Sequence, residues 1–152
     1  MPKCLQHPIS AKNLLDHIAD KKMISDLVPH KPPMLLIDRL IKTEKTRSTA
    51  EVFIRDDNLF LKEDKTVDEM IFPELIAQTA LIHEAWQHPN HKAQAYLTAF
   101  RNIIINRCAT SGELLIVGIK YISKLENLSW VEGTVYSVKE KLARGEVAVW
   151  IK

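Results

Sequence analysis

The most apolar stretch of the chain lies near its middle and has the pattern of a buried helix. Between residues 68 and 87, apolar side chains recur at positions that together cover most of a helix circumference. A helix that is apolar nearly all round is buried in a core. Pro73 must then lie in the first turn, where its missing N–H costs no hydrogen bond. The polar stretch 87–91, which contains Pro89, is expected to end the helix.

Most of the remaining chain has the alternation, or the richness in Val, Ile, Tyr and Trp, that is typical of β-strands. Six strands are expected, at residues 34–41, 48–54, 94–105, 113–124, 129–139 and 146–152. Turn signals at Gly112, Asn127 and Arg144-Gly145 leave short links, which favour antiparallel hairpins. One buried helix and six antiparallel strands predict an α+β fold in which a curved sheet wraps round the helix. Such a sheet cannot cover its helix completely, so pairing with a second subunit is expected.

The residues before the first expected strand divide into a short helix and a proline-rich turn. Ser10 could cap a helix whose apolar positions continue to about residue 27. The prolines within 29–33 then exclude regular structure. We therefore expect residues 1–27 to form a helical extension of a single domain that spans residues 1–152.

Composition and charge exclude several classes of function. The chain has 152 residues and a net charge of +2, which is too small to favour nucleic acid or an anionic membrane surface. No apolar run approaches the roughly 18 residues that span a bilayer, and the first residues have no apolar signal segment. We therefore expect a cytoplasmic location. Cys4 and Cys108 form no CxxC pair and are expected to be buried or free thiols in a reducing compartment.

Two titratable residues stand in surroundings that suit proton transfer. His30 precedes an apolar segment, and Glu74 is a carboxylate of the apolar helix. An imidazole titrates near neutral pH and can act as a base, whereas desolvation favours the protonated form of a carboxyl group, which can then act as an acid. Gln78, one helical turn after Glu74, could orient it. The plainer alternatives are a histidine that only caps a strand and a helix-start acid favoured by the dipole.

The segments around these residues contain two motifs. Residues 28–39 read Val-Pro-His-Lys-Pro-Pro-Met-Leu-Leu-Ile-Asp-Arg, and residues 74–78 read Glu-Leu-Ile-Ala-Gln. In this order and on these elements, they resemble the 3-hydroxyacyl-acyl carrier protein (ACP) dehydratases of the hot-dog fold. The sequence around the helix is most similar to the divergent dehydratase subunits of aryl polyene and related polyketide-like pathways.

The resemblance implies a reaction and an assembly. The reaction is dehydration of a 3-hydroxyacyl thioester on ACP to the 2-enoyl thioester, in fatty-acid or aryl polyene/polyketide-like biosynthesis. His30 would be the base and Glu74 the acid. The two would meet across the interface of a homodimer, or of a heterodimer with a second hot-dog subunit. The substrate is carried on phosphopantetheine, so no further cofactor is expected.

The chain departs from the family just before the helix. Typical members have Phe-Pro-Gly-x-Pro-x-x-Pro-Gly there, and the second Gly presents its backbone N–H to the thioester oxygen. Here Glu69 takes that position. Its N–H remains, but the carboxylates of Asp68 and Glu69 would oppose a developing oxyanion unless they point away. A non-catalytic subunit that binds acyl chains or completes a partner's active site therefore stays open. A thioesterase is disfavoured by the Pro-His segment.

Other polar residues have plainer interpretations. Three histidines lie at or after the end of the helix, at His83, His88 and His91. Their spacing fits no zinc signature, so no metal site is expected. Asp38 and Arg39 are expected to make polar contacts at a strand edge. A phosphopantetheine arm could be met by a basic residue at the mouth of the site, such as Lys31 or Arg101.

Overall fold

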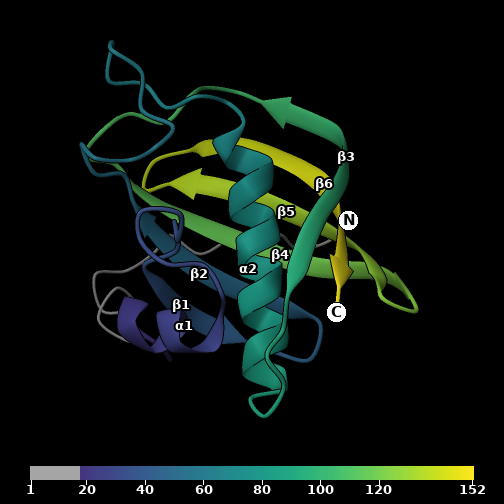
Figure 1. Ribbon diagram of the computed structural model, residues 1–152. Helices are drawn as coiled ribbons and strands as arrows, with labels where there is room; N and C mark the ends of the chain where they lie inside the picture. The colour runs from purple at the N-terminus through teal and green to yellow at the C-terminus, as the bar shows by residue number, and fades with distance from the viewer. Residues whose placement is uncertain (1–17) are drawn as a thin grey trace.

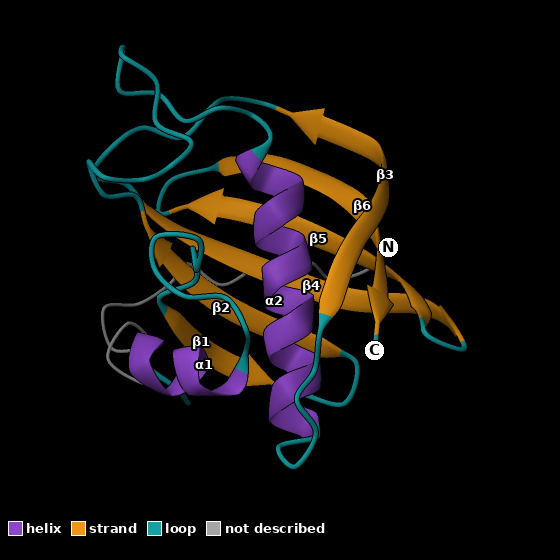
Figure 2. Ribbon diagram, in the orientation of Figure 1, coloured by secondary structure: helices purple, strands orange, loops and turns teal. Residues whose placement is uncertain are grey.

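A computed structural model describes residues 18–152 as two helices and six strands (Figures 1 and 2). The elements are α1 (Lys21–Leu27), β1 (Arg39–Thr43), β2 (Arg47–Phe53), α2 (Ile71–Gln87), β3 (Ala95–Ile105), β4 (Leu114–Leu125), β5 (Leu128–Ser137) and β6 (Lys141–Ile151). Most of the expected N-terminal extension, with its proposed cap at Ser10, lies outside the described residues. Within them, α1 begins after Asp20, whose side chain accepts a hydrogen bond from the Met23 N–H at 2.9 Å.

The six strands form one antiparallel sheet in the order β1-β2-β4-β5-β6-β3. The sheet curves round α2, which lies along its concave side (Figure 1). The strands β1 and β3 are therefore the two edges, and α1 lies at the β1 end. The predicted α+β arrangement, with a sheet wrapped round one buried helix, is confirmed.

The central helix α2 is buried over almost its whole length, as its sequence predicts. Thirteen of its residues are buried, and Pro73 occupies its first turn. The sheet approaches the helix closely at Gly133, where an added Cβ would lie only 2.4 Å from Ile76 Cγ1. The absence of a side chain at Gly133 of β5 therefore makes room for Ile76. Within residues 18–152, neither helix has the length and apolar character that crossing a bilayer requires.

The first strand begins later than the sequence predicts. Residues 34–38 were expected to be strand, but β1 starts at Arg39. The reason is that backbone groups of Met34 and Leu36 bind a side chain of α2 instead of a neighbouring strand: Leu36 N–H donates to Gln78, and Gln78 donates to the Met34 carbonyl. Leu35, Leu36 and Ile37 are nevertheless buried, which explains the apolar sequence.

The turn expected at Arg144-Gly145 is also wrong, because β6 runs without interruption from Lys141. The connection from β5 lies at residues 138–140, where Ser137 N–H bonds to the Glu140 carbonyl at 2.8 Å. Gly145 instead serves packing inside the sheet, since an added Cβ would lie 2.1 Å from Ile103 Cδ1. A glycine that admits a neighbouring side chain has the same sequence signature as a turn glycine.

Candidate active site

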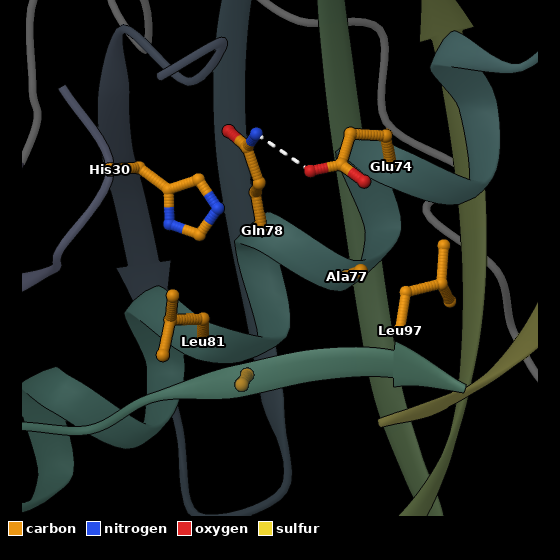
Figure 3. Close-up of a pocket in the computed structure, with 7 residues that line it drawn as sticks. His30, Glu74, Ala77, Gln78, Leu81 and Leu97 are labelled. Atoms are coloured by element: carbon orange, nitrogen blue, oxygen red, sulfur yellow. Dashed lines mark hydrogen bonds between the residues drawn. The ribbon is translucent and has the colours of Figure 1, made fainter. Parts of the chain in front are cut away.

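A recess of about 250 Å³, part of it open to solvent, lies between α2, the loop that carries His30 and the start of β3 (Figure 3). Its lining residues are His30, Glu74, Ala77, Gln78, Leu81, Ala95 and Leu97. The fold thus brings together three of the residues singled out in the sequence, from segments far apart in the chain. The remaining walls are apolar, which reduces solvation of the polar groups between them.

His30 reaches the recess from a loop between α1 and β1. The loop leaves α1 at Val28, whose N–H donates to the Ile24 carbonyl at 3.1 Å. Farther along, Leu35 N–H donates to the Lys31 carbonyl at 3.0 Å. The imidazole makes no hydrogen bond with any residue of 18–152, and its Nδ1 is buried without a partner. A buried polar atom without a partner is unusual and is often found at a functional site. The ring is therefore placed by its loop and its packing.

Gln78 connects the His30 loop to Glu74. It is only 3% exposed, and its amide makes three hydrogen bonds of 2.9 Å: Oε1 accepts from Leu36 N–H, and Nε2 donates to the Met34 carbonyl and to Glu74 Oε1. The two backbone groups fix which end of the amide is oxygen. Gln78 must therefore present a donor to Glu74, as the dashed line in Figure 3 shows.

Glu74 extends from the first turn of α2 into the recess and is half-buried. One of its oxygens is held by Gln78, and the side chain lies on the same wall of the recess as Ala77 (Figure 3). Within residues 18–152, the other oxygen makes no hydrogen bond. The carboxyl group is thus fixed at one atom and available at the other, which is the arrangement that proton donation to a ligand requires.

The structure does not bring Glu69 into the lining of the recess. This residue lies in the exposed turn just before α2. The neighbouring N–H of Met70 is occupied, since it donates to Asp68 Oδ1 at 2.9 Å. The N–H of Glu69 has no partner among the described residues. It is therefore a free donor at the start of the helix, with two carboxylates close by in the sequence.

The other polar candidates are held in interactions of their own. Asp38 accepts from Lys21, Arg55 and the Phe53 N–H, and Arg39 pairs with Glu51. These are the strand-edge contacts that the sequence predicts.

The two basic residues considered for the phosphopantetheine arm are engaged elsewhere. Arg101 pairs with Glu146 and lies 3.7 Å from the ring centroid of Trp130. The Lys31 ammonium binds carbonyl groups of α1. Across residues 18–152, no group of three or more His, Cys, Asp or Glu side chains is arranged to hold a metal ion.

His83 is buried on α2 away from the recess. Its Nδ1 lies 2.7 Å from Ser48 Oγ, and its ring packs against Tyr121 at a centroid distance of 5.0 Å. Burial lowers the pKa of His83 below the ordinary histidine value and raises the pKa of Tyr121. The environment therefore favours the neutral form of this imidazole, which is enclosed in the core.

The apolar wall of the recess was not predicted from the sequence. Leu81 could have been found, because it follows Glu74 and Gln78 at the helical spacing that places all three on one face. Ala95 and Leu97 alternate on β3, but no local pattern connects them with His30. Their place in the recess depends on how β3 crosses the helix.

The fold is that of known hot-dog proteins. The dehydratase heterocomplex ApeI:P from Xenorhabdus doucetiae has a TM-score of 0.78 and 18% identity, over 84% of this chain and 89% of the other. Protein smu.793 from Streptococcus mutans, solved with acetyl CoA, has a TM-score of 0.63 and 12% identity, over 82% and 94%. At these identities the similarity shows the fold alone, and the hot-dog fold expected from the sequence is confirmed.

Sequence comparison gives the family. Residues 22–151 match the ApeP-like model, which describes the ApeP dehydratase, and the chain therefore belongs to this dehydratase family. The chain is also 25% identical over 128 residues to the 3-hydroxyacyl-ACP dehydratase FabZ of Streptococcus agalactiae, an alignment that covers 82% of this chain and 91% of that protein. The expected relationship to hot-dog dehydratases is confirmed.

Proposed function

We propose that this chain catalyses dehydration of a 3-hydroxyacyl thioester carried on ACP, giving the 2-enoyl thioester, in fatty-acid or aryl polyene/polyketide-like biosynthesis. Membership of the ApeP-like dehydratase family and the similarity to FabZ support the reaction class. The observation that carries the proposal is that His30, Glu74 and Gln78 line one recess with apolar walls. The phosphopantetheine arm comes with the substrate, and no resident cofactor is part of the proposed reaction.

The proposed roles follow from the acid–base character of the two groups. His30 takes the proton from C2 of the acyl chain, a double bond forms between C2 and C3, and the C3–O bond breaks. Glu74 gives its proton to the departing hydroxyl, which leaves as water. The proton on His30 then returns to Glu74 through solvent, so the enzyme is restored without any other reactant.

Gln78 is proposed to orient Glu74 rather than to react. Its Nε2 donates to Glu74 Oε1 at 2.9 Å, and an atom that accepts this bond is not the one that carries the acid proton. The proton of Glu74 would therefore reside on Oε2. A fixed donor geometry of this kind lowers the cost of reaching the transition state.

The backbone N–H of Glu69 is the proposed donor for the charge that develops on the thioester oxygen. It is unpartnered among the described residues and lies at the positive end of α2. Because Glu69 is exposed, its side chain can remain in water while the N–H faces a bound ligand. The substrate would then extend from the helix start into the recess.

A second hot-dog subunit, identical or related, is proposed to complete the site. The edge strand β3 exposes Tyr96, Phe100 and Ile104, and the same strand contributes Ala95 and Leu97 to the recess. A partner seated along β3 would bury these apolar side chains and enclose the recess. The family resemblance implies that His30 acts with Glu74 of the other subunit, whereas within this chain the two residues line a single recess. The partner is proposed to close that recess in either arrangement.

The test is turnover of a 3-hydroxyacyl-ACP by the purified protein, followed by the mass of the acyl arm, which falls by one water. His30→Ala should reduce the rate by about 10²–10⁴-fold, the usual contribution of a general base. The matched control is His91→Ala, which removes an exposed histidine after α2 and should leave the rate unchanged. Equal rates for the wild type and His30→Ala would contradict the mechanism.

The second candidate function is a non-catalytic subunit that completes a partner's site. It is favoured by the start of α2, where Asp68 already occupies the Met70 N–H and Glu69 adds a second carboxylate. The dehydratase heterocomplex ApeI:P offers a precedent for a paired assembly. In that case the isolated chain would be inactive, and turnover would appear only on addition of a second hot-dog subunit.

A further inference from the structure

Lys31 directly follows the proposed base, and its ammonium group is not free to meet a ligand. Its Nζ donates to the carbonyl of Ser25 and, at 3.3 Å, to the carbonyl of Val28. Both carbonyls belong to the C-terminal end of α1, where the helix dipole is negative. The last turn of α1 contains no basic residue of its own. Lys31 therefore supplies from outside the helix the cation that this end lacks.

The sequence explains why these two carbonyls need an external donor. In a continuing helix the Ser25 carbonyl would accept from residue 29 and the Val28 carbonyl from residue 32, but both positions are proline and have no N–H. The prolines that end α1 thus leave two carbonyl groups without a backbone donor, and the flexible Lys31 side chain reaches both.

These bonds tie together the chain on either side of His30. Ser25 and Val28 precede the histidine, whereas Lys31 follows it, so its side chain closes a short loop round the base. On the far side, Gln78 holds Met34 and Leu36. The imidazole itself makes no hydrogen bond with any residue of 18–152. Its position is consequently set by the hydrogen bonds that hold its loop on either side, those of Lys31 and those of Gln78.

We infer that Lys31 is a positioning residue for His30 and does not bind the phosphopantetheine arm. The inference rests on the proposed dehydratase function, which it deepens. Loss of the ammonium would release the α1 end of the loop and let the imidazole move relative to Glu74. Since a displacement of about 1 Å can cost up to about 10²-fold in rate, the expected loss is large enough to measure.

The experiment compares Lys31→Met, Lys31→Arg and Lys22→Met on two substrates. One is the 3-hydroxyacyl-ACP, and the other is the N-acetylcysteamine thioester of the same acyl group, which lacks the carrier and most of the arm. Lys22 is an exposed neighbour on α1 with no described contact, so its substitution makes the same change of charge. Lys31 is itself exposed, and all variants should remain folded.

Lys31→Met should lower kcat about tenfold on both thioesters, with KM unchanged. Lys31→Arg, which keeps donors for both carbonyls, should retain at least half of the wild-type kcat, and Lys22→Met should behave as wild type. A raised KM for the ACP substrate with normal turnover of the small thioester would overturn the inference, because it identifies a carrier contact. Unchanged kinetics on both substrates would overturn it as well.

A second readout separates this inference from the proposed function. Amide hydrogen exchange at Leu35 and Leu36 should be faster in Lys31→Met than in Lys22→Met, since the loop is released at one end. Inactivity of the wild type on both thioesters, alone and with a second hot-dog subunit added, would contradict the proposed function. Equal exchange in the two variants would contradict the role of the Lys31 hydrogen bonds, whatever the activity.

Discussion

Glu74 near the start of α2 and His83 near its end are titratable residues on the same buried helix, but their surroundings differ. His83 is enclosed between the helix and the sheet, with Ser48 on one nitrogen and Tyr121 against its ring. Glu74 faces the recess, held by Gln78 at a single oxygen. The ring nitrogen of His83 thus has its hydrogen-bond partner within the core, whereas Glu74 keeps one oxygen for a ligand.

The difference teaches how to distinguish a structural polar group from a reactive one on an apolar helix. Burial alone does not do so, because His83 is the more buried of the two. What distinguishes the recess residues from His83 is hydrogen-bonding capacity that residues 18–152 leave unused: the second oxygen of Glu74 and the Nδ1 of His30. Preorganised groups with unused capacity are those that can act on a substrate.

The largest expected effect tests the proposed catalytic role of Glu74 at the start of α2. Glu74→Gln keeps the shape of the side chain but removes the proton to be donated, and kcat should fall by about 10²–10⁴-fold. Glu84→Gln makes the same change near His83 and should alter kcat by no more than about twofold. Steady-state turnover of the acyl-ACP substrate measures both. Comparable losses in the two variants would remove the distinction between the two ends.

A smaller effect is expected at Gln78, and it should appear in both stability and rate. In Gln78→Leu the buried N–H of Leu36 and the partly buried carbonyl of Met34 lose their partner, which should cost about 1–3 kcal/mol of unfolding free energy. The rate should fall about tenfold, because Glu74 is no longer oriented.

The control for Gln78 is Thr79→Val on the next helical position. The Thr79 hydroxyl donates only to the Leu75 carbonyl within the helix at 2.7 Å, so stability should change by no more than about 1 kcal/mol. Urea unfolding and turnover are measured side by side. A Gln78→Leu protein that matches Thr79→Val in both properties would show that the bridge to the His30 loop has no energetic role.

The smallest expected effect is the pH dependence of stability that is due to His83, near the end of α2. Burial lowers the pKa of His83 in the folded state, although Glu84 acts in the opposite direction. The unfolded chain, with a histidine pKa of about 6.5, then binds a proton more readily than the folded chain. The stability due to neutral His83 is therefore present above about pH 6.5 and is lost as the pH falls below it.

The measurement is the urea midpoint of unfolding at pH 7 and pH 5.5, for the wild type and for His83→Gln. The wild type should be less stable at pH 5.5, and the difference should shrink in the variant. Carboxylates with a lowered pKa, such as Glu113, titrate below this interval and do not contribute. An identical pH dependence in both proteins would assign the effect to another group.

Local patterns in the sequence determined the secondary structure and the identity of the chemical groups. The apolar run around Pro73 specified α2, because a side chain at every position round a helix must be buried. The motifs around His30 and Glu74 indicated the family and singled out the proposed pair, since each motif is continuous in the chain. Pro29 and Pro32 likewise imply carbonyls without partners at the end of α1.

The tertiary structure alone decided what each polar group contacts. Gln78 meets Met34 and Leu36, Lys31 turns back to α1, and Ala95 and Leu97 form a wall of the recess. No local pattern specifies such contacts, because they join segments whose distance depends on the curvature of the sheet round α2. The same reason explains the errors at residues 34–38 and at Gly145, where tertiary packing overrode signals that had predicted a strand and a turn.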